Sequence, residues 1–485
     1  MPLALPSLRS LPILAVVALL TVCGRAAPTP GITHVTADSR DFFRPPEAPA
    51  DQDWVYQTAC PFQVAPDRAA IFCSIRQGGA KAGGLQVGDD VIVFDRLPPA
   101  PPLQTVVVSR NELGTNPRSQ PADQPALLSK QLLQGGFVPR GAKRRDGSPH
   151  PHAGTGFGIT LVIAQRVGGA QGSLAEFPGE QSFHFHELYQ FAYDGAKFSV
   201  TGRQRLMREE VVPGWTIVNT GMRNAIADGD DLLMGMVASR IRGTKTEFES
   251  GVVRWRRDGD RWLAVAYTPV SSLDDEGDAS EPSLIRDVDD SLLFCARGGR
   301  NAPEVYNDIR IWRSTDGGGT WRKIIHARGA ISTAPLTLNQ AADGTPYVAA
   351  NLYEVLMEAP DSRSITDNPV YSIRPDAQGR YRLGGWLRNR LYLWPLNATR
   401  HALEAPRLIR DTIADFGRPP GRTSWRIDHP SGMNLRLADG RWHSVLGFRV
   451  MELGEGSQGL PPTAQTGAYL EEVVSTGAEW PVWNF

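Results

Sequence analysis

The stretch from Glu281 to Trp321 decides the fold of this chain. It opens as Glu281-Pro-Ser-Leu-Ile-Arg286 and continues, after an acidic turn, as Ser291-Leu-Leu-Phe-Cys-Ala-Arg297. A polar loop follows, and then the run Ile309-Arg-Ile-Trp-Arg-Ser314-Thr-Asp-Gly-Gly-Gly-Thr-Trp321. Short apolar runs separated by Asp- and Gly-rich turns are typical of antiparallel strands joined by hairpins.

The last part of this stretch fits the pattern S-x-D-x-G-x-T-W. The side chains of Ser314 and Asp316 can accept hydrogen bonds from nearby backbone N–H groups, and the glycines permit positive φ angles. Trp321 then starts the next strand, where an indole ring can pack between sheets. The pattern therefore predicts a tight hairpin stabilised by its own side chains.

This turn resembles the Asp-box of sialidases and related β-propellers. The strand beginning Glu281-Pro-Ser-Leu, followed by an apolar strand ending Ala-Arg297, resembles a second sialidase feature. In that family the glutamate assists the catalytic nucleophile, and the arginine is one of three that bind the substrate carboxylate. The resemblance implies those roles for Glu281 and Arg297, whereas the residues alone also allow a plain salt bridge between adjacent strands.

Length and composition agree with a large all-β domain. The chain has 485 residues, with 49 glycines, 38 prolines and 12 tryptophans, which suits many turns and aromatic strand residues. From residue 152 onward, strand-like runs alternate with Asp-Gly turns at Asp194, Asp258, Asp343 and Asp439. We therefore predict a β-propeller of six or seven blades, sialidase-like, over residues 56–485.

The N-terminal residues indicate export. Arg9 precedes a short apolar run at 11–22, and Ala26-Ala27 provides small residues for cleavage, so residues 1–27 are expected to be a signal for export to the periplasm or outside the cell. A lipid anchor at Cys23 is a second interpretation, which the preceding Val22 disfavours. Twelve apolar residues do not span a bilayer, and residues 28–55 are expected to be a Pro- and Ala-rich tether or an early wrapping segment.

Charge and cysteine content exclude several classes of function. The formal net charge is −1, so no global field for nucleic acid exists, and four cysteines are too few for a disulfide scaffold. Cys60 and Cys73 could pair in an oxidising compartment, while Cys295 lies in an apolar strand and is expected to be a buried thiol.

Six of the nine histidines fall in three places that could do chemistry: His150 and His152, His184 and His186, and His429 with His443. Paired histidines on a strand can bind zinc, but each pair lacks further ligands nearby, so no metal is assigned. The alternatives are histidines hydrogen-bonded to loop backbone or histidines that act as acid or base in a substrate pocket.

The chain departs from the sialidase pattern in two ways. No early Arg-Ile-Pro motif supplies the first arginine, and His429 stands where the nucleophilic tyrosine is expected. A looser resemblance, in residue types and architecture, is to ulvan lyases, which cut uronate polymers by β-elimination with His, Tyr and Arg. This resemblance adds substrate-binding and acid–base candidates, namely Tyr189, Arg240 or Arg242, and Tyr306.

We therefore expect a secreted, cofactor-free carbohydrate-active enzyme that cleaves acidic oligosaccharides or polysaccharides, with sialidase-like hydrolysis ahead of uronate elimination. A non-catalytic propeller that binds glycan or protein is the alternative from a different class. The catalytic candidates are Glu281, His429, His152, His186 and Tyr306. The substrate-binding candidates are Arg297, Arg242, His150, His184 and Tyr189.

Overall fold

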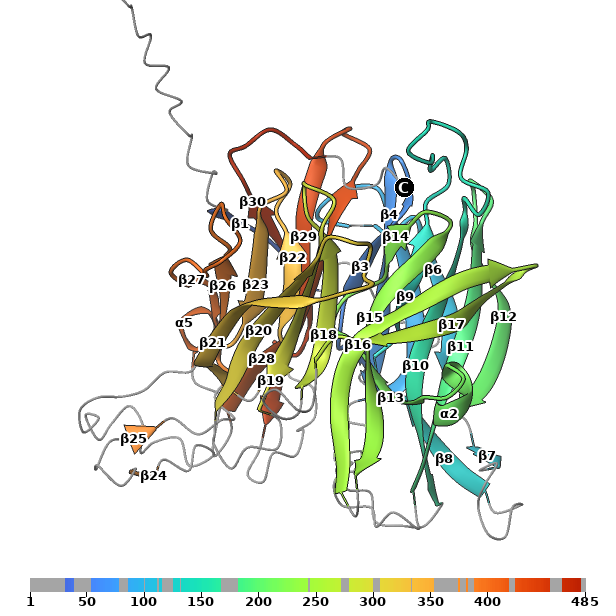
Figure 1. Ribbon diagram of the computed structural model, residues 1–485, viewed down its shortest axis with the longest axis horizontal. Helices are drawn as coiled ribbons and strands as arrows, with labels where there is room; N and C mark the ends of the chain where they lie inside the picture. The colour runs from blue at the N-terminus through green and yellow to red at the C-terminus, as the bar shows by residue number, and fades with distance from the viewer. Residues whose placement is uncertain are drawn as a thin grey trace, which may run out of the picture.

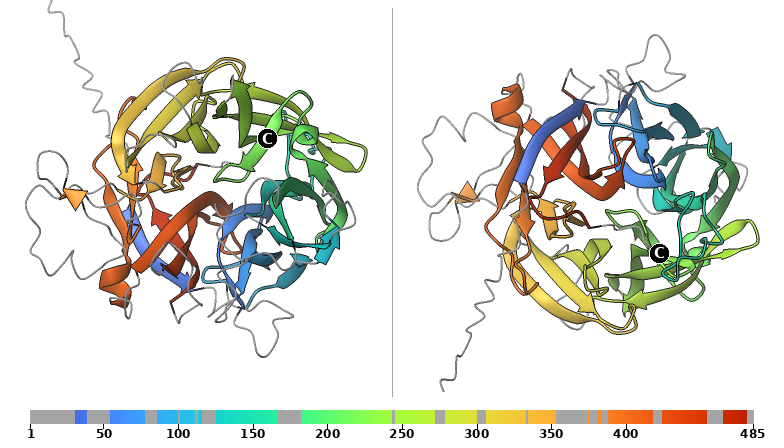
Figure 2. Two further views of the ribbon diagram at one scale, coloured as in Figure 1. Left: turned by 90° about the horizontal axis from the view of Figure 1, so that it is seen from below. Right: turned by 90° about the horizontal axis from the view of Figure 1, so that it is seen from above.

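The described part of the chain forms six antiparallel sheets arranged around a central axis, as a side view and two axial views show (Figure 1 and Figure 2). The structure is a computed structural model. It describes residues 31–38, 54–77, 86–99, 101–110, 113–115, 125–130, 132–166, 182–242, 245–271, 279–299, 306–332, 334–352, 374–375, 381–382, 388–417, 424–453 and 465–480. The prediction of an all-β propeller is confirmed, and the described residues contain six blades.

The first three blades follow one another along the chain, and in each blade the last three strands run in order towards the outer edge of the sheet. Blade 1 contains β2 (Trp54–Tyr56), β3 (Cys60–Ala65), β4 (Arg68–Gln77), β5 (Gln86–Phe94) and β6 (Gln104–Arg110). Blade 2 contains β7 (Leu113–Thr115), β8 (Pro125–Lys130), β9 (Gln134–Val138), β10 (Thr155–Arg166), β11 (Ser182–Tyr193) and β12 (Phe198–Met207). Blade 3 contains β13 (Thr216–Thr220), β14 (Ile226–Asp228), β15 (Asp231–Arg242), β16 (Lys245–Asp258) and β17 (Arg261–Pro269).

The other three blades complete the ring. Blade 4 contains β18 (Ala279–Arg286), β19 (Leu292–Gly298), β20 (Tyr306–Ser314) and β21 (Arg322–Ser332). Blade 5 contains β22 (Thr337–Gln340), β23 (Pro346–Ala350), β26 (Arg390–Pro395) and β27 (Arg407–Asp411). Blade 6 contains β28 (Ser424–Arg436), β29 (Trp442–Leu453), β30 (Gly467–Val474) and, at its outer edge, β1 (Gly31–Asp38).

The pairing of β1 with β30 joins the two ends of the chain in one sheet. The ring is therefore closed by backbone hydrogen bonds, which also cover the outer edge that the last hairpin would expose. β1 lies within the stretch 28–55 that the sequence marks as a tether or wrapping segment.

Little regular structure other than the blades occurs in the described residues. Helix α2 (Arg208–Val211) connects blades 2 and 3, and helix α5 (Thr412–Phe416) connects blades 5 and 6. A two-stranded ribbon of β24 (Arg374–Pro375) and β25 (Tyr381–Arg382) lies between β23 and β26 in the chain. No helix among the described residues is long and apolar enough to cross a membrane.

The apolar core lies between neighbouring blades. Each of the six interfaces has one cluster of buried side chains from both of its blades. Phe62 and Phe72 of blade 1 meet Phe137 and Phe191 of blade 2, with ring centroids 5.6–5.8 Å apart across the interface. Alternation along each strand sends every second side chain into such an interface, which is why the strand-like runs of the sequence are apolar.

The hairpin between β20 and β21 has the internal hydrogen bonds expected from its sequence. Asp316 accepts from the backbone N–H and the hydroxyl of Thr320, at 2.9 and 2.7 Å, and Ser314 Oγ accepts from the N–H of Gly318 at 2.9 Å. Gly318 adopts φ of 94°. The ring of Trp321 meets Phe294 edge to face, so the turn is tied to the blade 3–blade 4 interface.

The three cysteines among the described residues are buried thiols. Cys60 lies opposite Phe72 in the β3–β4 register, so the next residue of β4, Cys73, points to the other face of the sheet and the two cannot pair. Both are free and belong to different core clusters. Cys295 is also free and fully buried, as expected, and burial raises the pKa of its thiol.

A five-residue bulge of blade 3 is buried close to the axis of the ring. Residues 221–225 leave the sheet between β13 and β14 and are hydrogen-bonded to the innermost strands of other blades. The side-chain amide of Asn224 donates to the carbonyls of Cys60 and Pro61 in blade 1. Its Oδ1 accepts from the N–H of Gly135 in blade 2. The N–H of Met222 donates to Pro282 O, and Arg223 donates to Leu284 O, both in blade 4.

Candidate functional site

The innermost strands of blades 4 and 6 begin with the same local distortion. In β18 and β28 the ladder is interrupted by a bulge, between Ser280 and Ser283 and between Asp428 and Ser431. Within each bulge a residue before proline takes a positive φ, 53° at Glu281 and 54° at His429. Proline removes a ladder donor, and a non-glycine residue at such an angle costs about 1–3 kcal/mol. Strain of this kind tends to occur at functional sites.

Both distortions lie on one face of the ring. We call it the site face: it carries the ends of β19 and β29 and the starts of β18, β20 and β28. The turn at 315–321 and the β16–β17 turn lie on the opposite face. Because neighbouring strands are antiparallel, residues at the start of an innermost strand and at the end of the second strand come together there.

On the blade 4 side of the site, Glu281 and Arg297 form an ion pair. The Arg297 Nε and Glu281 Oε2 atoms are 3.0 Å apart, and the two side chains are 8% and 19% exposed. Arg297 also lies 3.4 Å from the hydroxyl of Ser280. A carboxylate and a guanidinium are thus held together near the axis, where little solvent screens their charges.

On the blade 6 side of the site, one buried carboxylate binds three guanidinium groups. Asp428 accepts hydrogen bonds from Arg388, which precedes β26, from Arg426 of β28 and from Arg449 of β29. Burial alone would raise the pKa of Asp428, but the charges of these arginines hold it well below its usual range. Asp428 is therefore ionised at every physiological pH and fixes the three arginines in place.

The same carboxylate orients His429. The ring Nδ1 of His429 lies 2.8 Å from Asp428 Oδ1, and because an ionised carboxylate only accepts, Nδ1 carries the proton. The lone pair is then on Nε2, which has no hydrogen bond to any described residue. Burial, with the charge of Arg449, lowers the pKa of His429 to about 4, while 18% of the side chain stays exposed. The geometry gives a neutral, partly accessible base at pH 7.

The two sides form one electrostatic unit. Burial lowers the pKa of Arg449, and the negative charge of the Glu281 carboxylate acts in the opposite direction and raises it. Burial likewise lowers the pKa of Arg388 to about 9, and the charge of Arg297 adds to the effect. The structure thus brings together Glu281, Arg297 and His429, three of the residues that the sequence singled out, from blades 4 and 6.

The histidines of blade 2 lie elsewhere. His150 contacts Gly229 O at 3.0 Å, and the ring of His152 packs edge to face on Trp262, both near the opposite face. His186 is fully buried between blades 2 and 3, with Nε2 3.1 Å from Ile217 O. His184 contacts Arg208 of α2.

The remaining candidates are also outside this cluster or outside the described side chains. Tyr189 is fully buried and donates to Glu187. Arg240 pairs with Glu249 at 2.9 Å and stacks on Trp215. Arg242 ends β15 and Tyr306 begins β20, but their side chains lie outside the described residues.

Sequence reasoning missed Asp428 and the three arginines that bind it. Arg449 had a usable signal, because it is a single charge within the apolar run Val445–Val450. Arg426 and Asp428 alternate with apolar residues at the start of β28, which is also a signal. Arg388 had none, since only the fold brings it to Asp428. Among the described residues, no group of three or more His, Cys, Asp or Glu side chains is arranged to hold a metal ion.

No family model matches the chain, and no curated protein sequence matches it. Solved structures do resemble it. A protein of unknown function from Dyadobacter fermentans aligns over 91% of this chain and 100% of its own, with 12% identity and a TM-score of 0.48. A GH93 α-L-arabinofuranosidase of Fusarium graminearum, in complex with arabinobiose, aligns over 91% and 98%, with 12% identity and a TM-score of 0.41.

An exo-1,5-α-L-arabinanase from a bovine ruminal metagenomic library aligns over 61% of this chain and 94% of its own, with 9% identity and a TM-score of 0.32. These values are below the level at which activity can be transferred between proteins. The function is therefore argued from the site alone.

Proposed function

We propose that this protein is a carbohydrate-active enzyme that cleaves glycosidic bonds in acidic glycans at the Glu281–His429 site. The observation that carries the proposal is the Asp428–His429 pair, whose arginine partners Arg449 and Arg388 interact electrostatically with Glu281 and Arg297 of the second ion pair. A neutral base, a carboxylate and an array of arginines are the groups that cleavage next to a negatively charged sugar substituent needs.

The arginines supply the preference for an acidic substrate. A guanidinium binds a planar carboxylate through two parallel hydrogen bonds. Arg388, Arg426 and Arg449 all contact Asp428, so three guanidinium groups are concentrated on this side of the site. A carboxylate on the substrate would be attracted to this side and would orient the sugar.

Hydrolysis is the first candidate reaction. Nε2 of His429 takes a proton from water, the water oxygen attacks the anomeric carbon, and the leaving oxygen takes a proton from solvent as its bond to that carbon breaks. Positive charge develops on the sugar ring in that transition state. The Glu281 carboxylate stabilises this charge, which is the reason to place hydrolysis first.

Elimination is the second candidate, and the identity of residue 429 favours it. A neutral histidine suits removal of the proton on the carbon next to a uronate carboxylate, and Arg297 would stabilise the negative charge that develops there. The protonated His429 then gives its proton to the leaving oxygen, so one residue serves as base and acid. The Glu281 carboxylate opposes the negative charge of this transition state.

The two reactions are separated by their products. We would offer the purified protein sialosides, ulvan, alginate and pectin in parallel. Hydrolysis releases a saturated acidic sugar that takes up oxygen from ¹⁸O-labelled water, and this release should be lost in Glu281→Gln. Elimination gives an unsaturated uronate that absorbs in the ultraviolet and takes up no solvent oxygen.

Either product should disappear in His429→Ala and persist in His443→Ala, a histidine of the same blade whose ring instead contacts Glu472 and Asp439. Saturable binding of an acidic glycan without any turnover would contradict the enzyme assignment and leave a glycan-binding propeller.

A further inference from the structure

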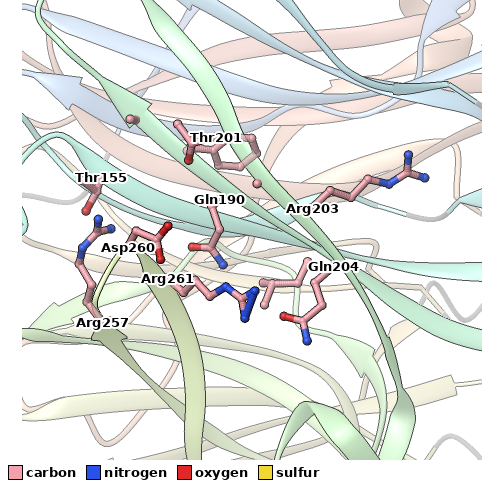
Figure 3. A pocket seen from close by; sticks show the side chains of 12 residues that line it. Thr155, Gln190, Thr201, Arg203, Gln204, Arg257, Asp260 and Arg261 are labelled. Carbon is pink, nitrogen blue, oxygen red and sulfur yellow. The ribbon is translucent and has the colours of Figure 1, made fainter.

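A pocket lies at the outer side of the ring, between blades 2 and 3. We call it the rim pocket (Figure 3). It has a volume of about 320 Å³, within the usual range of roughly 300–1,000 Å³ for small-molecule sites. One wall comes from β12, and the other comes from the end of β16 and the turn into β17. Among the residues that form it are Gln190, Thr201, Arg203, Gln204, Arg257 and Arg261.

The floor of the rim pocket is held rigidly. The side chain of Gln190 accepts from the N–H of Trp262 at 2.8 Å and donates to its carbonyl at 3.2 Å, which joins β11 to β17 across the blade interface. A bulge between β11 and β12 interrupts the ladder at Thr201. A Cβ on the next residue, Gly202, would lie 3.3 Å from the Gln190 side chain. Glycine at this position therefore leaves the hydrogen bonds of Gln190 undisturbed and keeps space in the pocket.

The charge in the rim pocket is not balanced. Arg203 pairs with Glu187 at 2.5 Å, a carboxylate that also binds Arg205. Arg257 is half buried, yet it has no hydrogen bond or ion pair to any described residue, and burial lowers its pKa while Asp260 counters this effect only in part. Arg261 likewise has no ion pair among the described residues. Asp260 is the one acidic residue among those that line the pocket, against the two guanidinium groups of Arg257 and Arg261.

The other walls suit a sugar ring. Thr201 and Gln204 offer a hydroxyl and an amide for sugar hydroxyls, while Leu188 and Phe191 behind them are only 1% exposed and belong to the core. Guanidinium groups beside these polar groups match a pyranose that carries a carboxylate or a sulfate.

We propose that the rim pocket is a non-catalytic binding site for one acidic sugar unit, held through its oxyanion by Arg257 and Arg261. The proposal shares the acidic glycan with the function proposed above, but it uses other residues, near the face opposite the Glu281–His429 site. A remote site of this kind keeps a polymer bound while its ends diffuse, which raises its effective concentration near the enzyme.

The test is a binding titration by calorimetry with the full chain carrying His429→Ala, which prevents turnover. The ligands are D-glucuronate, glucose 6-sulfate and glucose. Arg257→Gln should weaken binding of the preferred acidic sugar at least tenfold. Arg256→Gln is the matched control, because it removes the same charge from the neighbouring residue of β16, whose side chain pairs with Asp231 on the other face of the sheet. It should leave binding unchanged.

The three ligands identify the oxyanion. Preference for glucuronate assigns the pocket to a carboxylate, preference for glucose 6-sulfate assigns it to a sulfate, and equal binding of glucose contradicts the proposal. Equal losses in Arg256→Gln and Arg257→Gln, or no loss in either, also overturn it. Turnover is measured separately with the native His429, so an inactive protein with Arg257-dependent binding would refute the proposed function and leave the rim pocket standing.

Discussion

Blades 2 and 3 on one side of the ring, and blades 4 to 6 on the other, use histidine in different ways. His186 and His429 have the same lowered pKa, about 4, and burial is the first cause for both. His186 is enclosed between strands and bonds a backbone carbonyl, whereas His429 bonds a carboxylate and keeps part of its ring exposed. A shifted pKa alone therefore does not identify a catalytic histidine. The exposed fraction of the side chain separates the two, since His429 keeps 18% and His186 keeps none.

The strongest test of this comparison is His429→Ala. We expect a loss of activity of about 10²–10⁴-fold, the usual contribution of a general base, with little change in melting temperature. His186→Ala should do the opposite, lowering stability and leaving the activity of the folded protein intact. Equal activity losses in the two variants would remove the distinction between the two sides of the ring.

The pH profile of the wild-type enzyme sharpens this prediction. His429 acts as a base only when it is neutral, so activity should rise as the pH increases through about 4 and stay level past 6.5. An acid limb centred near 6.5 would mean that the ring is not held as the structure indicates.

The next largest effect concerns acid stability. The ordinary pKa of His186 is 6.5 in the unfolded chain and about 4 in the folded protein, so unfolding takes up a proton between these values. Stability is then complete above pH 6.5 and falls as the pH drops towards 4, by on the order of 3 kcal/mol for this one group. Urea unfolding across this range should show the loss, and His186→Leu should reduce it. A pH dependence unchanged in the variant would contradict this assignment.

A smaller effect is expected from Arg297→Lys. Lysine keeps the charge beside Glu281 but loses the planar fork, so activity on an acidic substrate should fall at least about tenfold, which corresponds to about 1.4 kcal/mol. The loss should appear mainly in kcat/KM. Arg313→Lys, an arginine of the same blade near the opposite face that pairs with Asp289, is the control. Full activity in Arg297→Lys would exclude Arg297 from substrate binding.

The smallest effect is expected from Asp316→Ala. Its carboxylate accepts several hydrogen bonds within one exposed turn, at the outer part of blade 4 and away from the site. The variant should melt at a slightly lower temperature and keep its kcat. An inactive variant with normal melting would show that this turn contributes to the site.

Sequence patterns predicted the fold well because each blade repeats a local rule. The Asp-Gly turns and the alternation of apolar residues belong to neighbouring positions, so they can be read without the rest of the chain. Glu281 and Arg297 could be predicted as a pair in the same way, since they lie on consecutive strands of one blade.

The residues that surround His429 could not be predicted from local sequence patterns. Arg388 and Asp428 are 40 residues apart and meet only because blades 5 and 6 adjoin. The histidine pairs of blade 2 were conspicuous in the sequence, but their spacing carries no information on whether they face the axis or a blade interface. An Xaa-Pro dipeptide near the start of the innermost strand, at Glu281-Pro282 and His429-Pro430, is the local signal that the sequence does carry.

The bulge at 221–225 has a consequence for how a polymer can be handled. Its residues Met222, Arg223 and Asn224 are 2–3% exposed, and the segment is hydrogen-bonded to blades 1, 2 and 4 around the axis. For the function proposed above, a glycan chain is therefore expected to approach from the site face and to leave by the same face, because this buried segment joins the innermost strands of three blades.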